Sequence, residues 1–261
     1  MGIWSHGIIR VSIIADKEYT MQISTYRLPE DVPVHFCMNK TAVIIDVLRA
    51  TTTIVTALRN GARNVIPVSE VEEAVELSRN FSPEDRVLAG ERMALQIDGF
   101  DLSNSPLEFT GERVRDKTVF LTTTNGTRAI QKTQASETLI GALVNATATG
   151  QYLAKQERDV VLICAGTLGQ FSMEDTLAAG AIIHAIQETD PSAETDDYSL
   201  ASLLLYRHCD TEKKMHHLLD QTQHYRRLKG LGKTEDLTYC LQQDSMPVLA
   251  GYEDGSVSLL K

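Results

Sequence analysis

The stretch from Thr41 to Gly61 constrains the fold of this chain more than any other. It begins with the apolar run Ala42 to Ile45 and then changes abruptly to Asp46, an arginine and three threonines. An apolar run of that length is typical of a strand that is buried on both faces of a parallel sheet. The amphipathic pattern from Thr51 onwards predicts a helix that ends at Gly61. The polar residues between them are therefore expected at the carboxyl end of a strand, where open α/β sheets bind ligands.

The same order of strand, loop and helix repeats through residues 40–190. Further strands are predicted at residues 8–14, 64–68, 86–89, 117–121, 138–142 and 159–164, with residues 15–40 as a mixed connection. Because such crossovers are right-handed and pair strands in parallel, the pattern predicts an α/β fold, a three-layer α/β/α sandwich around a largely parallel sheet. Residues 196–240 are mostly helical in pattern, so we expect a helical C-terminal part.

The domain organisation follows from where this pattern holds. Residues 1–7 are expected to be a tail and residues 8–261 a single α/β domain. The polar segment 189–197 offers an alternative boundary, which would make residues 198–261 a helical appendage with a terminal hairpin around Glu253-Asp254-Gly255.

Charge and composition bear on the partners of the chain. Its 261 residues are 43% hydrophobic and 23% charged, which is ordinary for a globular protein. The formal net charge of −10 repels nucleic acid and anionic membranes, so we expect neither as a partner. A small anionic substrate is still compatible, because the Debye length is about 8 Å at physiological salt and a local cluster of arginines decides binding inside a pocket.

The cysteines and the apolar runs indicate a compartment. Four cysteines lie far apart without a CxxC pair, which favours reduced thiols in a cytoplasmic protein: Cys37, Cys164, Cys209 and Cys240. No apolar run approaches the length of about 18 residues that spans a membrane, and the first residues lack the pattern of a signal peptide. A homodimer is the default expectation for the oligomeric state.

Four of the predicted strands end in unusual polar loops, at residues 46–53, 90–106, 122–129 and 165–175. In a parallel sheet all four would emerge at the same edge. The first three loops each contain an arginine, namely Arg49, Arg92 and Arg128. Three of the loops also carry carboxylates, which include Asp46, Glu91, Glu174 and Asp175.

The residue types in these loops indicate a chemistry. Arginines give bidentate hydrogen bonds to phosphate, sulfonate or carboxylate, and helix N-termini favour anions. Carboxylates beside them are explained if they hold a hard cation such as Mg²⁺, which bridges protein and phosphate oxygens. The combination predicts phosphoryl chemistry on a small anionic phosphorylated substrate.

Each feature also has a purely structural explanation. Asp46, Ser172 or Asp175 could cap the helix that follows it, and Arg49 or Arg128 could be a surface salt-bridge partner. The clustering of all these residues in loops at one predicted edge favours the functional interpretation.

Other motifs are weaker. The sequence GLGKT at 230–234 resembles the end of a phosphate-binding P-loop, but Arg227 stands where that motif requires glycine. Cys164 precedes a glycine loop, but the arginine of a cysteine phosphatase is replaced by Gln170, so we expect a buried thiol. Most of the histidines in the helical region lack a metal-binding pattern and are expected to be solvated or core residues: His208, His216, His217 and His224.

The four loop segments carry a resemblance to a known family. NKTAVIIDVLRATTT, LAGERMALQIDGFDLSNSP, LTTTNGTRAI and AGTLGQFSMEDTLAAG resemble the 2-phosphosulfolactate phosphatase family of coenzyme M biosynthesis. The resemblance covers about residues 40–185 and continues more loosely to the end of the chain. It implies a Mg²⁺-dependent phosphatase domain that converts 2-phosphosulfolactate and water to sulfolactate and phosphate. Another phosphorylated 2-hydroxy acid, or a non-catalytic sensor of small polyanions, is the alternative.

The site expected on these grounds is defined residue by residue. Asp46, Glu91 and Asp175 are the predicted catalytic residues and metal ligands. Arg49 and Arg128 are expected to bind the phosphate, and Arg92 the carboxylate or sulfonate. Backbone donors are expected from two segments, represented by Thr124, Asn125, Gly126 and Thr127 and by Gly166, Thr167 and Gly169. Asp46 could attack phosphorus itself, or a metal-activated water could attack with a carboxylate as base.

Overall fold

The computed structural model describes residues 19–209 and 211–260. The predicted tail at 1–7 and strand at 8–14 lie outside these residues. The strands are β1 Gln22–Tyr26, β2 Thr41–Ile45, β3 Asn64–Val68, β4 Arg86–Arg92, β5 Leu95–Gln96, β6 Thr118–Thr122, β7 Glu137–Gly141, β8 Val160–Cys164, β9 Glu194–Thr195, β10 Ala250–Glu253 and β11 Ser256–Leu259. The α-helices are α1 Ala50–Arg59, α2 Val71–Ser78, α3 Gly111–Val114, α4 Gly126–Lys132, α5 Ala146–Leu153, α6 Met173–Thr189, α7 Asp197–His208, α8 Glu212–Leu219, α9 Gln223–Gly230 and α10 Thr234–Cys240.

The strands form one mixed sheet in the order β5-β4-β6-β3-β11-β10-β7-β2-β8-β1-β9. Strands β4, β6 and β3 run parallel to one another, and so do β7, β2, β8, β1 and β9. The C-terminal hairpin β10–β11 pairs antiparallel with β7 on one side and with β3 on the other. The predicted α/β class with a largely parallel sheet is confirmed. The predicted terminal hairpin joins the two parallel groups.

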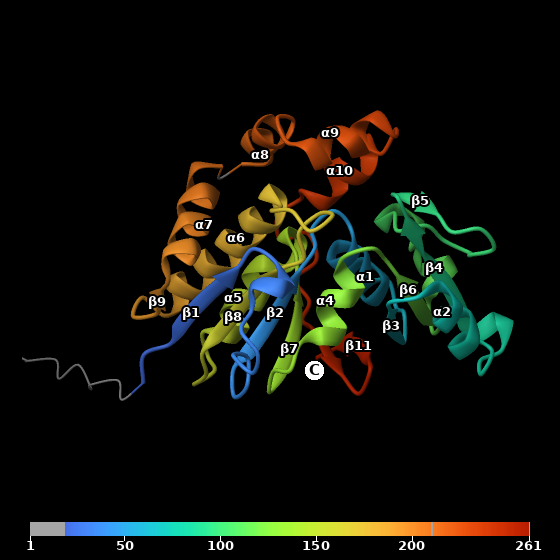
Figure 1. The fold of residues 1–261 in the computed structure, drawn as a ribbon, viewed down its shortest axis with the longest axis horizontal. Helices are drawn as coiled ribbons and strands as arrows, with labels where there is room; N and C mark the ends of the chain where they lie inside the picture. The colour runs from blue at the N-terminus through green and yellow to red at the C-terminus, as the bar shows by residue number, and fades with distance from the viewer. Residues whose placement is uncertain (1–18, 210, 261) are drawn as a thin grey trace, which may run out of the picture.

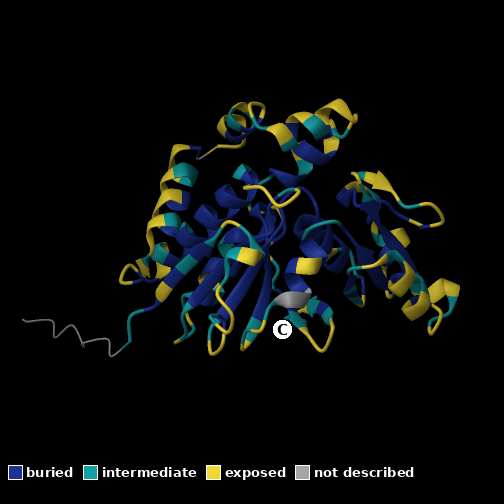
Figure 2. Cartoon of the chain, in the orientation of Figure 1, coloured by how far each residue is buried: buried dark blue, intermediate teal, exposed yellow. Residues whose placement is uncertain are grey.

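The middle strands show why the sheet has helices on both faces. Along β2, Val43 and Ile45 pack into a core with α5 and α6, whereas Ala42 and Ile44 pack into a second core with α1 and α4. Side chains alternate between the faces of a strand, so an uninterrupted apolar run needs a cover on each side. Figure 2 shows these strands buried between helices whose exposed residues face outwards. The predicted three-layer sandwich is therefore confirmed.

The helical C-terminal part lies over one end of the sheet. Figure 1 places α8, α9 and α10 across the top of the molecule, above α1 and the adjoining strand ends. The Asp236 carboxylate of α10 accepts hydrogen bonds from Arg49 and, at 2.6 Å, from Ser105 Oγ. These buried bonds attach helices α8, α9 and α10, which are called the helical cover below, to two of the four loops. Among the described helices, none is both long and apolar enough to cross a membrane.

Two details concern the predictions made from sequence. Strand β1 falls within the segment 15–40, for which no strand was predicted, because its inward positions are Ile23 and the polar Thr25. Thr25 is buried, and its hydroxyl is satisfied by a hydrogen bond of 2.7 Å with the hydroxyl of Ser199, a partner far along the chain. The four cysteines are buried thiols in this structure.

Candidate active site

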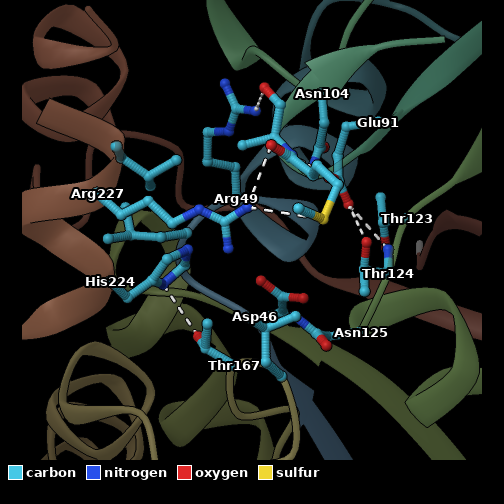
Figure 3. A pocket seen from close by; sticks show the side chains of 15 residues that line it. Asp46, Arg49, Glu91, Asn104, Thr123, Thr124, Asn125, Thr167, His224 and Arg227 are labelled. Atoms are coloured by element: carbon cyan, nitrogen blue, oxygen red, sulfur yellow. Dashed lines mark hydrogen bonds between the residues drawn. The ribbon is translucent and has the colours of Figure 1, made fainter. Parts of the chain in front are cut away.

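The loops that follow β2, β4, β6 and β8 line one cavity of about 530 Å³, part of it open to solvent (Figure 3). Helix α9 closes another side. The lining residues are Asp46, Leu48, Arg49, Glu91, Met93, Ala94, Asn104, Thr123, Thr124, Asn125, Thr167, Leu168, His224, Arg227 and Leu228. The structure thus brings the four predicted loops together and adds the helical cover to them.

Asp46 is the carboxylate at the meeting point of two helices. Its Oδ1 accepts a hydrogen bond of 3.3 Å from the Ala50 N–H at the start of α1. Its Oδ2 lies against Gly126, the first residue of α4, where an added Cβ would stand only 2.7 Å from that oxygen. Burial raises the pKa of Asp46 to about 6, although the nearby His224 acts in the opposite direction. A capping carboxylate with such a pKa can exchange a proton near neutral pH.

Glu91 ties two of the loops together. Its Oε1 accepts hydrogen bonds of 2.9 Å from both the N–H and the hydroxyl of Thr124, and its Oε2 accepts one of 2.7 Å from the Ala94 N–H. The carboxylate is buried but lines the cavity. The Thr124 N–H, predicted to bind the substrate, therefore donates to Glu91 in this structure.

Asp175 supports the site from behind. Its two oxygens accept hydrogen bonds from the Val47 N–H at 2.8 Å and the Gly166 N–H at 3.1 Å. Ser172 caps α6 by accepting from the Asp175 N–H, so one of the structural explanations applies to this loop. Burial raises the pKa of Asp175 well above its usual range, and the nearby Asp46 adds to the effect. Asp175 is absent from the cavity lining, so its position favours orientation of the loops over the predicted contact with metal or substrate.

The three predicted arginines have protein partners. Arg49 lines the cavity but forms a buried ion pair with Asp236. Arg92 donates 2.8 and 3.0 Å hydrogen bonds to the Ser69 carbonyl and the Thr122 hydroxyl, outside the cavity. Arg128 is half-exposed and lies 3.5 Å from Glu70, beside a neighbouring hollow that Gly169 also lines. Arg49 thus lines the cavity with its charge paired, Arg128 stands at the adjoining hollow and Arg92 lies outside both, and the substrate contacts of all three stay predictions.

The other predicted substrate residues divide into two sets. Asn125 and Thr167 line the cavity with Thr124. Thr127 is buried and donates its hydroxyl to the Thr123 carbonyl, which braces the first turn of α4. Gly166 is needed for its backbone, since its φ is +67° and a Cβ there would meet Leu28 at 2.3 Å.

Helix α9 contributes two basic residues that sequence reasoning missed. Figure 3 shows the Arg227 guanidinium directed into the space above Asp46, with His224 beside it. Arg227 Nη2 donates a hydrogen bond of 3.3 Å to the Met93 carbonyl. The two residues stand three apart on one helix, a spacing that puts both on the same face. That spacing was the only signal in the sequence, and it could not say which loops the helix would meet.

The oxygen atoms around the cavity fit a small hard cation. The Asn104 side chain lines the cavity at 4% exposure, and its Oδ1 has no hydrogen-bond partner. Glu91 lies on the same wall in Figure 3. Within residues 19–209 and 211–260, no three His, Cys, Asp or Glu side chains converge as a ready-made metal cage. Mg²⁺ commonly needs only one or two carboxylates, because it keeps water and phosphate oxygens as ligands.

Comparison with known proteins identifies relatives along nearly the whole chain. The family model described as 2-phosphosulpholactate phosphatase matches residues 26–255. A probable 2-phosphosulfolactate phosphatase of Caldanaerobacter subterraneus subsp. tengcongensis is 46% identical over 239 residues, which are 91% of this chain and 98% of that protein. Proteins of the same name from Clostridium beijerinckii and Symbiobacterium thermophilum are 40% and 43% identical, covering 91% and 88% of this chain and 99% and 98% of their own length.

The chain is therefore a phosphoric monoester hydrolase built on a three-layer α/β sandwich. Within that class, it belongs to the 2-phosphosulpholactate phosphatase family.

Proposed function

We propose that this enzyme uses Mg²⁺ to hydrolyse 2-phosphosulfolactate to sulfolactate and phosphate in the cavity between the four loops and α9. The names of the relatives support the substrate, because their similarity extends over nearly their whole length. The observation that carries the location is Asp46, a buried carboxylate with a pKa of about 6 that faces Arg227 across the cavity.

Arg227 is the proposed principal ligand of the substrate's anionic groups. Its guanidinium enters the cavity, whereas the charge of Arg49 is already paired with Asp236. A guanidinium binds phosphate, sulfonate or carboxylate oxygens in a bidentate manner. Asn125 and Thr167 line the cavity as additional polar groups, and Arg128 stands at the adjoining hollow for a group that reaches beyond it.

Glu91 and Asn104 are the proposed ligands of Mg²⁺. Glu91 is held in place by Thr124 and Ala94, and the buried Asn104 Oδ1 offers an acceptor atom without a protein partner. A bound Mg²⁺ supplies charge neutralisation for the phosphoryl oxygens, which is where most catalysis of phosphoryl transfer resides. Asp46, Glu91 and Asp175 were all predicted to bind the metal. In this proposal Glu91 keeps that role, Asp175 orients the loops and Asp46 transfers a proton.

Asp46 is the proposed general base. A base works best when its pKa lies near the working pH, and burial brings the pKa of this carboxyl to about 6. Asp46 takes a proton from the attacking water, while Gly126 leaves room for the carboxylate beside α4. Trapping of a phosphorylated protein after acid quench, with the phosphate on Asp46, would show instead that Asp46 attacks phosphorus itself.

The substrate alternative is another phosphorylated 2-hydroxy acid, and family membership favours an enzyme over the non-catalytic sensor. The protein is incubated with 2-phosphosulfolactate, 2-phospholactate and 3-phosphoglycerate, and phosphate release is measured. We expect the highest kcat/KM for 2-phosphosulfolactate, its loss with EDTA and its recovery with added Mg²⁺. A higher kcat/KM for 2-phospholactate would contradict the proposed substrate, and full activity in EDTA would contradict the proposed metal.

A Glu91→Gln variant examines the metal assignment separately. Removal of one charge from the proposed ligand pair should raise the Mg²⁺ concentration needed for half-maximal rate by about 10–100-fold. An unchanged Mg²⁺ requirement would contradict the role of Glu91. Glu108, whose carboxylate binds Ser103 outside the cavity lining, provides the matched control as Glu108→Gln.

A further inference from the structure

We propose that His224 is the general acid that protonates the leaving oxygen of the substrate, with Glu174 as its positioning residue. The inference rests on the proposed phosphatase function and goes beyond it by naming the proton donor. His224 stands on α9 and lines the cavity, and its side chain is 17% exposed. Phosphate esters of hydroxy acids have alkoxide leaving groups, which need a proton as the P–O bond breaks.

Glu174 fixes the orientation of the ring. Its Oε1 lies 2.6 Å from His224 Nδ1, and its carboxylate is 2% exposed at the start of α6. A carboxylate only accepts hydrogen bonds, so Nδ1 carries a hydrogen and the ring cannot turn freely. Thr167 Oγ1 lies 3.0 Å from the same nitrogen and restrains the ring further. The nitrogen left for the substrate is therefore Nε2.

The ring and the proposed base come from different parts of the chain and line the same cavity. Asp46 follows β2 and lies between α1 and α4, whereas His224 belongs to α9. Figure 3 shows both side chains below the Arg227 guanidinium, with the Asp46 carboxylate to one side of the His224 ring. A phosphoryl group in this cavity can meet the attacking water on the Asp46 side and lose its ester oxygen on the His224 side. In-line displacement requires the water and the ester oxygen on opposite sides of phosphorus, so the proposal places the water beside Asp46 and the ester oxygen beside His224.

The proposed hydrolysis moves one proton to Asp46 and one from His224. The water oxygen bonds to phosphorus and its proton goes to Asp46. The bond between phosphorus and the ester oxygen breaks, and its electron pair stays on that oxygen. The oxygen then takes the hydrogen of His224 Nε2, which gives the free hydroxy acid and a neutral ring. Solvent returns the proton to Nε2 after the products leave, and Asp46 releases its own.

A pair of substrates with different leaving groups distinguishes proton donation from a structural role. The esters are 2-phospholactate and its 3,3,3-trifluoro analogue, which carry the same charges, but the fluorinated alkoxide leaves with less help from an acid. For His224→Asn we expect kcat/KM to fall about 10²–10⁴-fold on 2-phospholactate and by less than about tenfold on the trifluoro ester. For Glu174→Gln we expect a smaller fall in kcat/KM, which should again be larger on 2-phospholactate than on the trifluoro ester. The control is His217→Asn, an exposed histidine of α8, which should hydrolyse both esters as the wild type does.

Equal losses of His224→Asn on the two esters, or no loss on 2-phospholactate, would overturn the assignment of the general acid. The wild type provides a second measurement that does not depend on the folding of a variant. With an internal acid its rates on the two esters should be similar, and a rate that is much higher on the trifluoro ester would also overturn the assignment. If the wild type releases phosphate from neither ester, nor from 2-phosphosulfolactate, the proposed function itself fails.

Discussion

A single methyl group added at Gly126 should disable the site. Gly126 is the first residue of α4, and a Cβ built on it would stand 2.7 Å from Asp46 Oδ2 and 2.7 Å from the Ala50 Cβ. Non-bonded carbon atoms prefer separations of about 3.5–4.0 Å, so the methyl group overlaps the Ala50 Cβ by about 1 Å and also stands too close to the Asp46 oxygen. Both neighbours are buried, and neither is the end of a long flexible side chain. The Gly126→Ala variant must therefore move either α4 or the Asp46 carboxylate.

The size of the effect differs between stability and activity. Overpacking of this kind costs about 1–3 kcal/mol, and each kcal/mol lowers the Tm of a domain of this size by about 2–4 °C. Displacement of a catalytic group by about 1 Å costs about 10²-fold in rate. We therefore expect a folded protein with a Tm lowered by several degrees and a kcat/KM lowered by about 10²-fold.

The assays are phosphate release and thermal unfolding followed by circular dichroism. Gly230→Ala is the matched control, because a Cβ at the end of α9 has no neighbour within 4 Å. That variant should keep the activity and the Tm of the wild type. A Gly126→Ala protein with normal kcat/KM would refute the reasoning, since the Asp46 carboxylate would then not need its observed position.

Two further outcomes concern charged residues. Burial raises the pKa of Asp46 from 3.8 to about 6, so its stabilising protonated form is lost as the pH rises through about 6. Asp46→Asn should accordingly be more stable than the wild type near pH 7, by up to about 3 kcal/mol, with the difference vanishing near pH 3 in a denaturant titration. Arg227→Ala should lower kcat/KM by about 10²–10³-fold with little change in Tm, whereas Arg92→Ala should lower the Tm and change kcat/KM by less than about tenfold. Similar kcat/KM losses for the two arginine variants would contradict the assignment of Arg227.

The fold could be predicted from sequence where burial leaves a clear pattern. Strands such as Thr41–Ile45 and Asn64–Val68 are continuous apolar runs or nearly so, and their ends agree with the prediction to within one residue. Strand β1 was missed because Thr25 is polar. Its buried hydroxyl finds its hydrogen-bond partner in Ser199, 174 residues further on, which no local pattern reveals. The hairpin β10–β11 was predicted, but its place between β7 and β3 depends on partners that no local pattern reveals.

The candidate site could likewise be predicted only in part, because local patterns do not reveal distant partners. The loops could be found from sequence because each polar segment follows a buried strand. The roles of single residues could not, because a role depends on the partner. Arg49 carries the charge of a phosphate ligand, but Asp236, 187 residues away, pairs with it. His224 and Arg227 lie in an ordinary helical pattern and gain their meaning only when α9 meets the loops.

The central claim is that Asp46 performs chemistry in a site made by the four loops and α9. It is tested most directly by the kcat of the Asp46→Asn variant on 2-phosphosulfolactate at saturating Mg²⁺, with circular dichroism to show that the variant is folded. The geometry predicts a folded protein whose kcat is lower than that of the wild type by about 10²–10⁴-fold. A folded variant with a kcat close to that of the wild type would contradict the claim and place the chemistry elsewhere in the molecule.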